Sequence, residues 1–236
     1  MRILAIDSSA TAASAALVED GKVLGEFYIN TRLTHSQTLM PMIDYVLKCT
    51  RAELSGVDLF AVSAGPGSFT GIRIGVASIK GLAMAQHKPC VGVSTLEAIA
   101  RNLEHLEGTV CAVMDARCQQ VYNAVFAARH GCLERITPDR ALSMEALAKE
   151  CENYTKPLFL VGDGAKLCYN SQWFQNISVV LPPEPLIYQR ACGVAKSALT
   201  AYERGGAVTP AALMPIYLRL PQAERELKKR LKGEEK

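Results

Sequence analysis

The segment SAGPGSFTGIRIGVASIKGLA constrains this chain more than any other part of the sequence. An apolar run at 58–64 predicts a buried strand, Gly-Pro-Gly predicts a tight turn, and 69–86 predicts a helix. Ser68 can cap that helix, while Gly65 and Gly67 allow a close backbone approach. The segment lacks the lysine of a P-loop and the spacing of a dinucleotide fingerprint. We therefore interpret these glycines as packing positions rather than as a phosphate loop.

Small residues recur every four positions along the predicted helix and form two ridges, which lie about 200° apart by helix geometry. The ridges are Gly67, Gly71 and Gly75, and Ala77, Gly81 and Ala85. A glycine inside a helix costs roughly 1 kcal/mol relative to alanine, so each ridge calls for an offsetting close contact. We expect one ridge on the chain's own sheet and the other against a second helix. A helix enclosed wholly within its own domain is the alternative.

The remaining pattern predicts an α/β protein with two lobes, at 1–106 and 107–236. Strands are expected in the first lobe at 3–7, 13–20, 22–29, 58–64 and 89–93, with helices at 35–49, 69–86 and 96–106. The second lobe is expected to have strands at 110–115, 120–127, around 133, 158–162 and 178–181, helices at 143–151, 165–171 and 187–203, and a basic tail. Both lobes begin with strand, aspartate, strand. This repetition suggests duplicated, mixed-sheet subdomains.

The composition excludes several classes of protein. With 49% hydrophobic and 21% charged residues the chain resembles an ordinary globular protein. No uncharged stretch reaches the roughly 18 apolar residues of a membrane span, and Asp7 interrupts the only signal-like run, so we expect a cytoplasmic protein. The eight cysteines include no C-x-x-C pair, which disfavours zinc ribbons and redox motifs and favours buried thiols.

The charge is too small and too local for a general nucleic-acid-binding face. The net charge is +3, and residues 219–236 supply all of it. Strong RNA binding by this chain alone is therefore not expected. The tail at 222–236 predicts a short, mostly solvated helix, with partner contact or RNA binding as weaker alternatives.

Two aspartates follow predicted strands and form a candidate nucleotide site. In actin, heat-shock chaperones and sugar kinases, a strand–aspartate–strand element binds phosphate and metal. Here Asp7 begins Asp-Ser-Ser, which also turns for local hydrogen-bonding reasons. Asp115 is followed by Ala-Arg-Cys-Gln rather than by glycines, and these side chains would crowd a phosphate. The candidate, vestigial site comprises Asp7, Ser8, Gly65, Gly67, Ser68 and Asp115. Gly162 and Gly164 are better explained as a helix entry than as an adenine contact.

Six segments in order resemble the TsaB (YeaZ) family, which helps to make threonylcarbamoyladenosine in tRNA. They are MRILAIDSSATAASAAL, THSQTLMPMID, AGPGSFTGIRIGVASIKGLA, GVSTLEAIA, MDARCQQVY and PIYLR, and they span nearly the whole chain. The resemblance implies the two-lobed actin/heat-shock-chaperone/sugar-kinase (ASKHA) fold and a homodimer. It also implies partnership with the catalytic subunit TsaD and the ATPase TsaE. TsaD transfers a threonylcarbamoyl group from its adenylate to the adenosine beside the anticodon.

The resemblance also indicates what this chain lacks. Where TsaD has two metal-binding histidines with three residues between them, this sequence has Thr95 and Ile99, which cannot replace imidazoles. We therefore expect a non-catalytic scaffold that binds no metal or cofactor by itself. ATP, ADP and metal are expected on TsaD and TsaE, and tRNA only through the complex. The alternative is a small-molecule kinase or ATPase that uses Asp7 and Asp115 with magnesium.

The expected interface with a second copy or with TsaD is a bundle of four helices, two from each partner. From this chain it uses the helices at 35–49 and 69–86. The residues expected to form it are Met42, Tyr45, Val46, Cys49, Ile74, Ala77, Ser78, Gly81 and Ala85. His35, at the start of the first helix, is expected to cap the helix or to be solvated rather than to act in catalysis.

Overall fold

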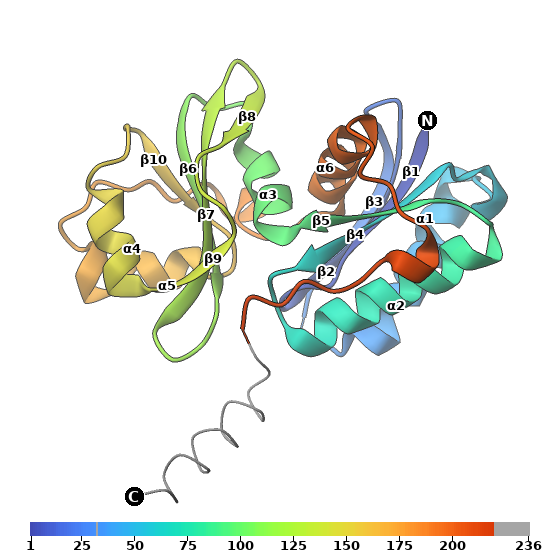
Figure 1. The fold of residues 1–236 in the computed structure, drawn as a ribbon, viewed down its shortest axis with the longest axis horizontal. Coiled ribbons are helices and arrows are strands. Elements are labelled where there is room, and N and C mark those ends of the chain that lie inside the picture. The colour runs from blue at the N-terminus through green and yellow to red at the C-terminus, as the bar shows by residue number, and fades with distance from the viewer. Residues whose placement is uncertain (32, 220–236) are drawn as a thin grey trace, which may run out of the picture.

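The computed structural model describes residues 1–31 and 33–219, which form two α/β lobes, each built on its own five-stranded sheet (Figure 1). The first sheet has the order β3-β2-β1-β4-β5. Its strands are β1 (Arg2–Asp7), β2 (Ala12–Glu19), β3 (Lys22–Asn30), β4 (Leu59–Gly65) and β5 (Cys90–Ser94). β1 pairs antiparallel with β2 and parallel with β4, so the sheet is mixed.

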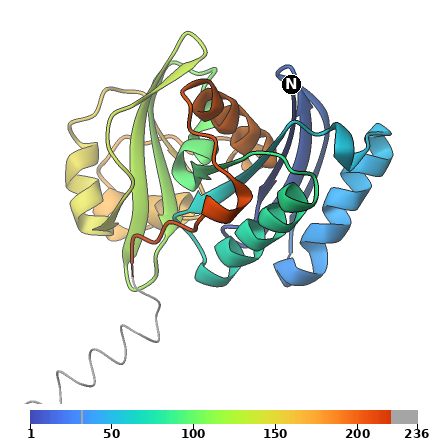
Figure 2. The same ribbon diagram turned by 45° about the vertical axis from the view of Figure 1, so that its right-hand side comes forward.

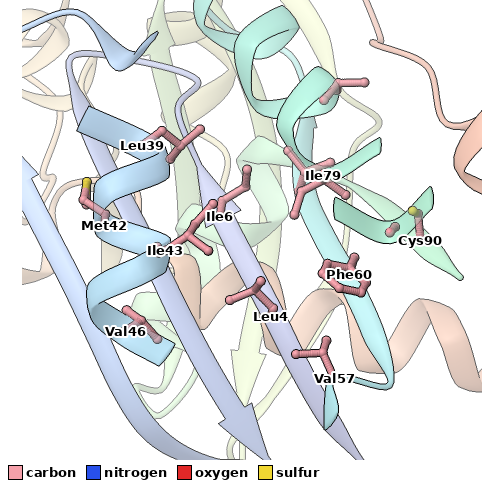
Figure 3. Close-up of a cluster of buried hydrophobic side chains, with 14 of the residues drawn as sticks. Leu4, Ile6, Leu39, Met42, Ile43, Val46, Val57, Phe60, Ile79 and Cys90 are labelled. Carbon is pink, nitrogen blue, oxygen red and sulfur yellow. The ribbon is translucent and has the colours of Figure 1, made fainter. Parts of the chain in front are cut away.

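Helices cover both faces of the first sheet because its central strands are apolar on both sides. On one face lie α1 (His35–Thr50) and α2 (Phe69–Ala85), packed side by side (Figure 2). Figure 3 shows Leu39 and Ile43 of α1 pointing toward Leu4 and Ile6 of β1. The alternate β1 residues Ile3 and Ala5 face the other side of the sheet, as the two-residue period of a strand requires.

The second sheet has the order β10-β6-β7-β8, with β9 also paired to β7. Its strands are β6 (Gly108–Asp115), β7 (Gln120–Arg129), β8 (Cys132–Arg135), β9 (Arg140–Ser143) and β10 (Leu158–Val161). The helices α4 (Met144–Cys151) and α5 (Ala165–Tyr169) cover one face. The short helix α3 (Thr95–Ala100) packs Leu96 and Ile99 on the other face and lies between the lobes (Figure 1).

The predicted division at residue 106/107 is wrong for the last part of the chain. Helix α6 (Ala191–Glu203) packs Ala191, Val194, Ala195 and Ala198 against the free face of the first sheet. The following segment also stays on the first lobe, where Val208 bridges to Cys90 of β5. The small side chains of α6 meet Ala5 of β1, Ala16 of β2 and Ala61 of β4, so the helix can approach that sheet closely. Residues 191–208 therefore follow the second lobe in sequence but belong to the first lobe in space.

Other predicted elements differ in extent. The strand expected at 178–181 is reduced to a bridge between Phe159 and Val180, and the helix expected from Ile187 begins at Ala191. The helix expected to reach Leu106 ends at Ala100, followed by a 3₁₀ turn at Arg101–Leu103. The helix predicted at 222–236 lies outside the described residues. Among the residues that are described, no helix is both long and apolar enough to cross a bilayer.

Candidate functional site

A cleft of about 730 Å³ separates the two lobes. The first lobe lines it with the β1–β2 loop and the turn before α2, and the second with the β6–β7 hairpin and Asp163. Residues 216–219 of the C-terminal segment lie along its mouth. Of the predicted nucleotide-site residues, Gly67, Ser68 and Asp115 line this cleft, whereas Asp7, Ser8 and Gly65 do not.

Asp7 is fully buried behind the cleft wall. Its Oδ1 accepts hydrogen bonds from the backbone N–H (2.9 Å) and the hydroxyl (2.7 Å) of Ser9, and its Oδ2 accepts one from the Ser63 hydroxyl of β4. Burial raises the pKa of Asp7, because the charged form loses water, and these hydrogen bonds oppose that rise. Both carboxylate oxygens thus accept hydrogen bonds within the protein, and Asp7 is not part of the cleft lining.

The first glycine ridge of α2 packs on the β1–β2 loop. A Cβ at Gly71 would lie 2.1 Å from the Ser8 carbonyl oxygen, and one at Gly67 2.5 Å from the Ser9 carbonyl oxygen. Ser8 Oγ donates to the Gly71 carbonyl at 2.9 Å, which ties the loop to the helix. Ser68 caps α2, since its hydroxyl accepts from the Gly71 N–H at 3.3 Å. Gly67 and Gly71 thus approach the β1–β2 loop closely, as the packing interpretation expects.

Gly65 packs against the C-terminal segment rather than against a ligand. Its φ is +139°, and a Cβ there would lie 2.1 Å from the Ile216 carbonyl oxygen. The Ile216 N–H donates to the Ala64 carbonyl at 2.7 Å. The chain's own backbone therefore covers this side of the Gly-Pro-Gly turn. Sequence reasoning missed this contact, and the only signal for it was the late PIYLR motif.

The β6–β7 hairpin closes without glycine. Arg117, Cys118 and Gln119 are all in the left-handed region, with φ of 64°, 54° and 57°. Asp115 holds this turn, because its carboxylate accepts from the Arg117 N–H at 2.7 Å and from the Arg117 guanidinium at 3.2 Å. The Arg219 guanidinium donates to the Ala116 carbonyl and links the C-terminal segment to the second lobe. The carboxylate of Asp115 is thus already paired.

Asp163 is a cleft residue that the sequence analysis did not single out. Burial, with the charge of Asp115 nearby, raises its pKa to about 6, while a 2.9 Å hydrogen bond from Gln189 Nε2 opposes the rise. The flanking glycines serve packing, since a Cβ at Gly162 would lie 2.1 Å from the Val113 carbonyl oxygen. The Gly-Asp-Gly turn that precedes α5 was the only sequence signal for this residue.

The predicted partner-facing residues divide into exposed and buried sets. Among the described residues, no atom outside the backbone of α2 itself lies within 4 Å of an added Cβ at Gly81. Tyr45 is 54% exposed and stacks on Phe27. The other exposed members are Cys49, Ala77 and Ala85, with Ile74 and Ser78 half-buried. The assignment of Met42 and Val46 to this surface is wrong, because both lie in the core beneath α1.

The remaining candidate positions are structural. Thr95 and Ile99 are buried between the lobes, and no group of three or more His, Cys, Asp or Glu that could hold a metal occurs in the described part of the chain. His35 is half-buried rather than solvated, with Nε2 2.6 Å from the Ala10 carbonyl oxygen. Cysteine burial is predicted correctly only in part, since four thiols are buried and Cys49, Cys118 and Cys132 are exposed.

Comparison with known proteins identifies the family. The family model described as TsaD, tRNA N6-adenosine threonylcarbamoyltransferase, matches residues 23–178. The Bacillus subtilis tRNA threonylcarbamoyladenosine biosynthesis protein TsaB is 30% identical over 95% of this chain and 96% of its own length. The Escherichia coli protein of the same name is 41% identical over 53% of this chain and 55% of its own length.

The solved structures agree with the sequence relatives. YeaZ from Pseudomonas aeruginosa superposes with a TM-score of 0.75 at 28% identity, covering 92% of this chain and 99% of that one. The ethanolamine utilization protein EutJ from Carboxydothermus hydrogenoformans matches with a TM-score of 0.50 at 14% identity, covering 83% of this chain and 89% of that one, and shows the fold alone. Together with the two mixed sheets, these matches confirm the two-lobed α/β fold of the actin and sugar-kinase type. The chain belongs to the TsaB (YeaZ) family of proteins for tRNA threonylcarbamoyladenosine biosynthesis.

Proposed function

We propose that this chain is a non-catalytic scaffold subunit of the cytoplasmic complex that transfers threonylcarbamoyl to tRNA. In this proposal the chain binds TsaD, works with the ATPase TsaE, and leaves ATP, ADP and metal to those partners. The observation that carries the proposal is the outer ridge of α2. Gly81 lies exposed in a helix interior with no neighbour, although glycine there costs roughly 1 kcal/mol relative to alanine. A close helix contact from another chain is the physical reason for such a position.

The rest of the outer helical face supports the same proposal. Tyr45 and Met84 are both more than half exposed, and Ala77, Ala85 and Cys49 are also exposed on the same two helices. Small and apolar side chains on two adjacent helices form a surface that a second helix pair can cover. Since this chain and TsaD match one family model, TsaD can offer equivalent helices in a pseudo-two-fold arrangement. A second copy of this chain would then compete with TsaD for the same face.

The cleft argues against a catalytic role for the chain alone. Asp7 is buried and bonded to Ser9 and Ser63, so its carboxylate is not presented to magnesium. Asp115 does line the cleft, but its ion pair with Arg117 neutralises the carboxylate and places a positive charge beside it, which disfavours a magnesium ion there. The residues present therefore do not fit a magnesium nucleotide. The kinase or ATPase alternative predicts micromolar binding of ATP and magnesium, with turnover, to the isolated chain. Titration calorimetry that detects both would replace the scaffold proposal with the enzymatic one.

The scaffold proposal is tested by size-exclusion chromatography with light scattering, on the chain alone and mixed with TsaD from the same organism. We expect a dimer alone and a one-to-one complex on mixing. Gly81→Leu should abolish both and leave the circular dichroism spectrum unchanged. Glu145→Leu, which adds the same side chain to an exposed position on α4, is the matched control and should abolish neither. Normal TsaD binding by Gly81→Leu would show that the interface lies elsewhere.

A further inference from the structure

The C-terminal segment forms a second surface, on the side of α2 away from α1. Residues 211–219 run along α2 and then reach the second lobe (Figures 1 and 2). Lys80 Nζ contacts the Ala211 carbonyl at 3.1 Å, Arg73 Nε donates to the Tyr217 hydroxyl at 2.9 Å, and Arg219 donates to the Ala116 carbonyl. These contacts place Lys80, Arg73 and Arg219 in that order along one path. We call this surface the cleft-mouth strip.

The cations of the strip are not neutralised by carboxylates among the described residues. Neither Lys80, Arg73 nor Arg219 has a carboxylate oxygen within 4.0 Å there, whereas Arg117 beyond them pairs with Asp115. Their hydrogen bonds go to carbonyl and phenol oxygens, which leave the positive charge in place. The strip therefore carries three cations, of which Arg73 is exposed and Lys80 and Arg219 are half-buried, and it reaches the cleft at Arg219.

Aromatic rings lie between these cations. Tyr217, 40% exposed, packs on Phe69 with ring centroids 4.7 Å apart, and the Arg73 guanidinium lies 3.9 Å above the Phe69 ring. Tyr122 and Tyr188 line the same cleft from the second lobe. Cations beside an exposed ring such as Tyr217 are the chemistry by which proteins bind single-stranded nucleic acid. Bases of any sequence can stack on such rings while the cations hold the phosphates.

The acidic residues of the cleft restrict where each part of a nucleotide can lie. Asp115 and Asp163 lie on the second-lobe wall of the cleft, where a phosphate would be repelled. Each carboxylate oxygen has a second lone pair beyond its contact with Arg117 or Gln189, and this lone pair can accept a hydrogen bond from the amino group of a base. Phosphates therefore fit the strip, and bases fit the cleft.

We propose that the cleft-mouth strip binds single-stranded RNA, with phosphates at Lys80, Arg73 and Arg219 and a base stacked on Tyr217. The identity of the RNA as the tRNA anticodon loop rests on the proposed function, whereas the binding chemistry rests on the strip alone. The proposal departs from the expectation that tRNA reaches this chain only through the complex. Three cations make a weak site, which suits a subunit that adds contacts to a larger RNA-binding assembly.

The test is fluorescence anisotropy of a fluorescein-labelled anticodon stem–loop RNA with the full chain, without TsaD, over a salt series. Arg73→Ala and Lys80→Ala should each reduce the slope of log K against log salt by about 0.7, as expected for one lost phosphate contact on a single strand. Lys22→Ala removes an exposed cation at the β2–β3 turn, at the far end of the first sheet, and should leave the slope unchanged. Every variant keeps residues 220–236, so the contribution of the tail is constant.

Stacking has its own variants and competitors. Tyr217→Ala should weaken RNA binding about 5- to 100-fold, and Tyr217→Phe should stay within about twofold of the native chain. Arg73→Lys keeps the positive charge, so its slope of log K against log salt should match that of the native chain. This variant keeps the test valid if Arg73→Ala is poorly folded. Equal effects of Arg73→Ala and Lys22→Ala, or no RNA binding at low salt, would overturn the proposal. If AMP competes with the labelled RNA as well as unlabelled RNA does, the strip is a mononucleotide site and the proposal is wrong. If polyglutamate displaces the RNA and Tyr217→Ala has no effect, the strip instead fits an acidic protein partner. If these variants lose RNA binding but still bind TsaD normally, the loss concerns the cleft-mouth strip alone and leaves the scaffold proposal intact.

Discussion

Two glycines of α2 offer a matched test of the packing argument, because the same substitution should have opposite effects at each. Gly71 and Gly81 both lie inside the helix, so Gly→Ala removes the same backbone entropy from the unfolded chain at either position. The surroundings differ. An added Cβ at Gly81 meets nothing within 4 Å, whereas at Gly71 it lies 2.1 Å from the Ser8 carbonyl oxygen.

The magnitudes follow from these distances. Gly81→Ala should gain the full helix-propensity difference, about 1 kcal/mol, which corresponds to roughly 2–4 °C in Tm for a chain of this size. At Gly71 the same gain is outweighed, because the added methyl group must push the Ser8 carbonyl away. The hydrogen bond from the Ser8 hydroxyl to the Gly71 carbonyl resists that movement. Overpacking of this kind costs roughly 3 kcal/mol, so a net loss of about 2 kcal/mol is expected.

The assay is urea unfolding followed by circular dichroism at several protein concentrations. At low concentration Gly81→Ala should be more stable than the native chain and Gly71→Ala less stable. If a second copy covers Gly81, the gain at Gly81 should shrink as the concentration rises, because the added methyl group weakens the dimer. A destabilised Gly81→Ala at every concentration would refute the assignment of this ridge to the exposed face. A neutral Gly71→Ala would refute the close approach to the β1–β2 loop.

Two further predictions concern the buried carboxylates. Burial raises the pKa of Asp163 from 3.8 to about 6. Between about pH 4 and 6 the folded state therefore binds more protons than the unfolded state. The contribution of this group to the free energy of unfolding falls as the pH rises through that window. At 1.36 kcal/mol per pKa unit, Asp163→Asn should raise the free energy of unfolding by about 3 kcal/mol at pH 8 and change it little at pH 4. Equal effects in urea unfolding at both pH values would contradict this. Asp7→Ala leaves the hydroxyls of Ser9 and Ser63 without their acceptor and should cost roughly 3 kcal/mol in thermal unfolding. A stable Asp7→Ala variant that had lost an ATP affinity present in the native chain would instead support the kinase alternative.

Much of the fold could be predicted from the sequence because periodicity reports which side of an element faces its own core. The apolar runs between turn signals and the four-residue spacing in α2 predict strands, helices and two small-residue ridges in nearly the observed places. The motif order also predicts the family, which the comparison with Bacillus subtilis TsaB confirms. The predicted partner-facing surface of α1 is partly wrong, because Met42 and Val46 lie on the buried face of the helix.

The candidate site depended on residues far apart in the chain. The Ser63 hydroxyl, on β4, donates a hydrogen bond to Asp7, so this candidate metal ligand is a buried structural group. Ile216 covers the turn at Gly65, and α6 returns to the first sheet after the second lobe is complete.

The sequence by itself determined the local elements, the absence of a metal-binding histidine pair at Thr95 and Ile99, and the family. Only the tertiary structure decided which glycine ridge is covered, which aspartate faces the cleft, and why Asp163 has a raised pKa. The reason is physical. Periodicity is a property of one segment, whereas burial, hydrogen-bond partners and electrostatic environment are set by segments that meet only when the chain is folded.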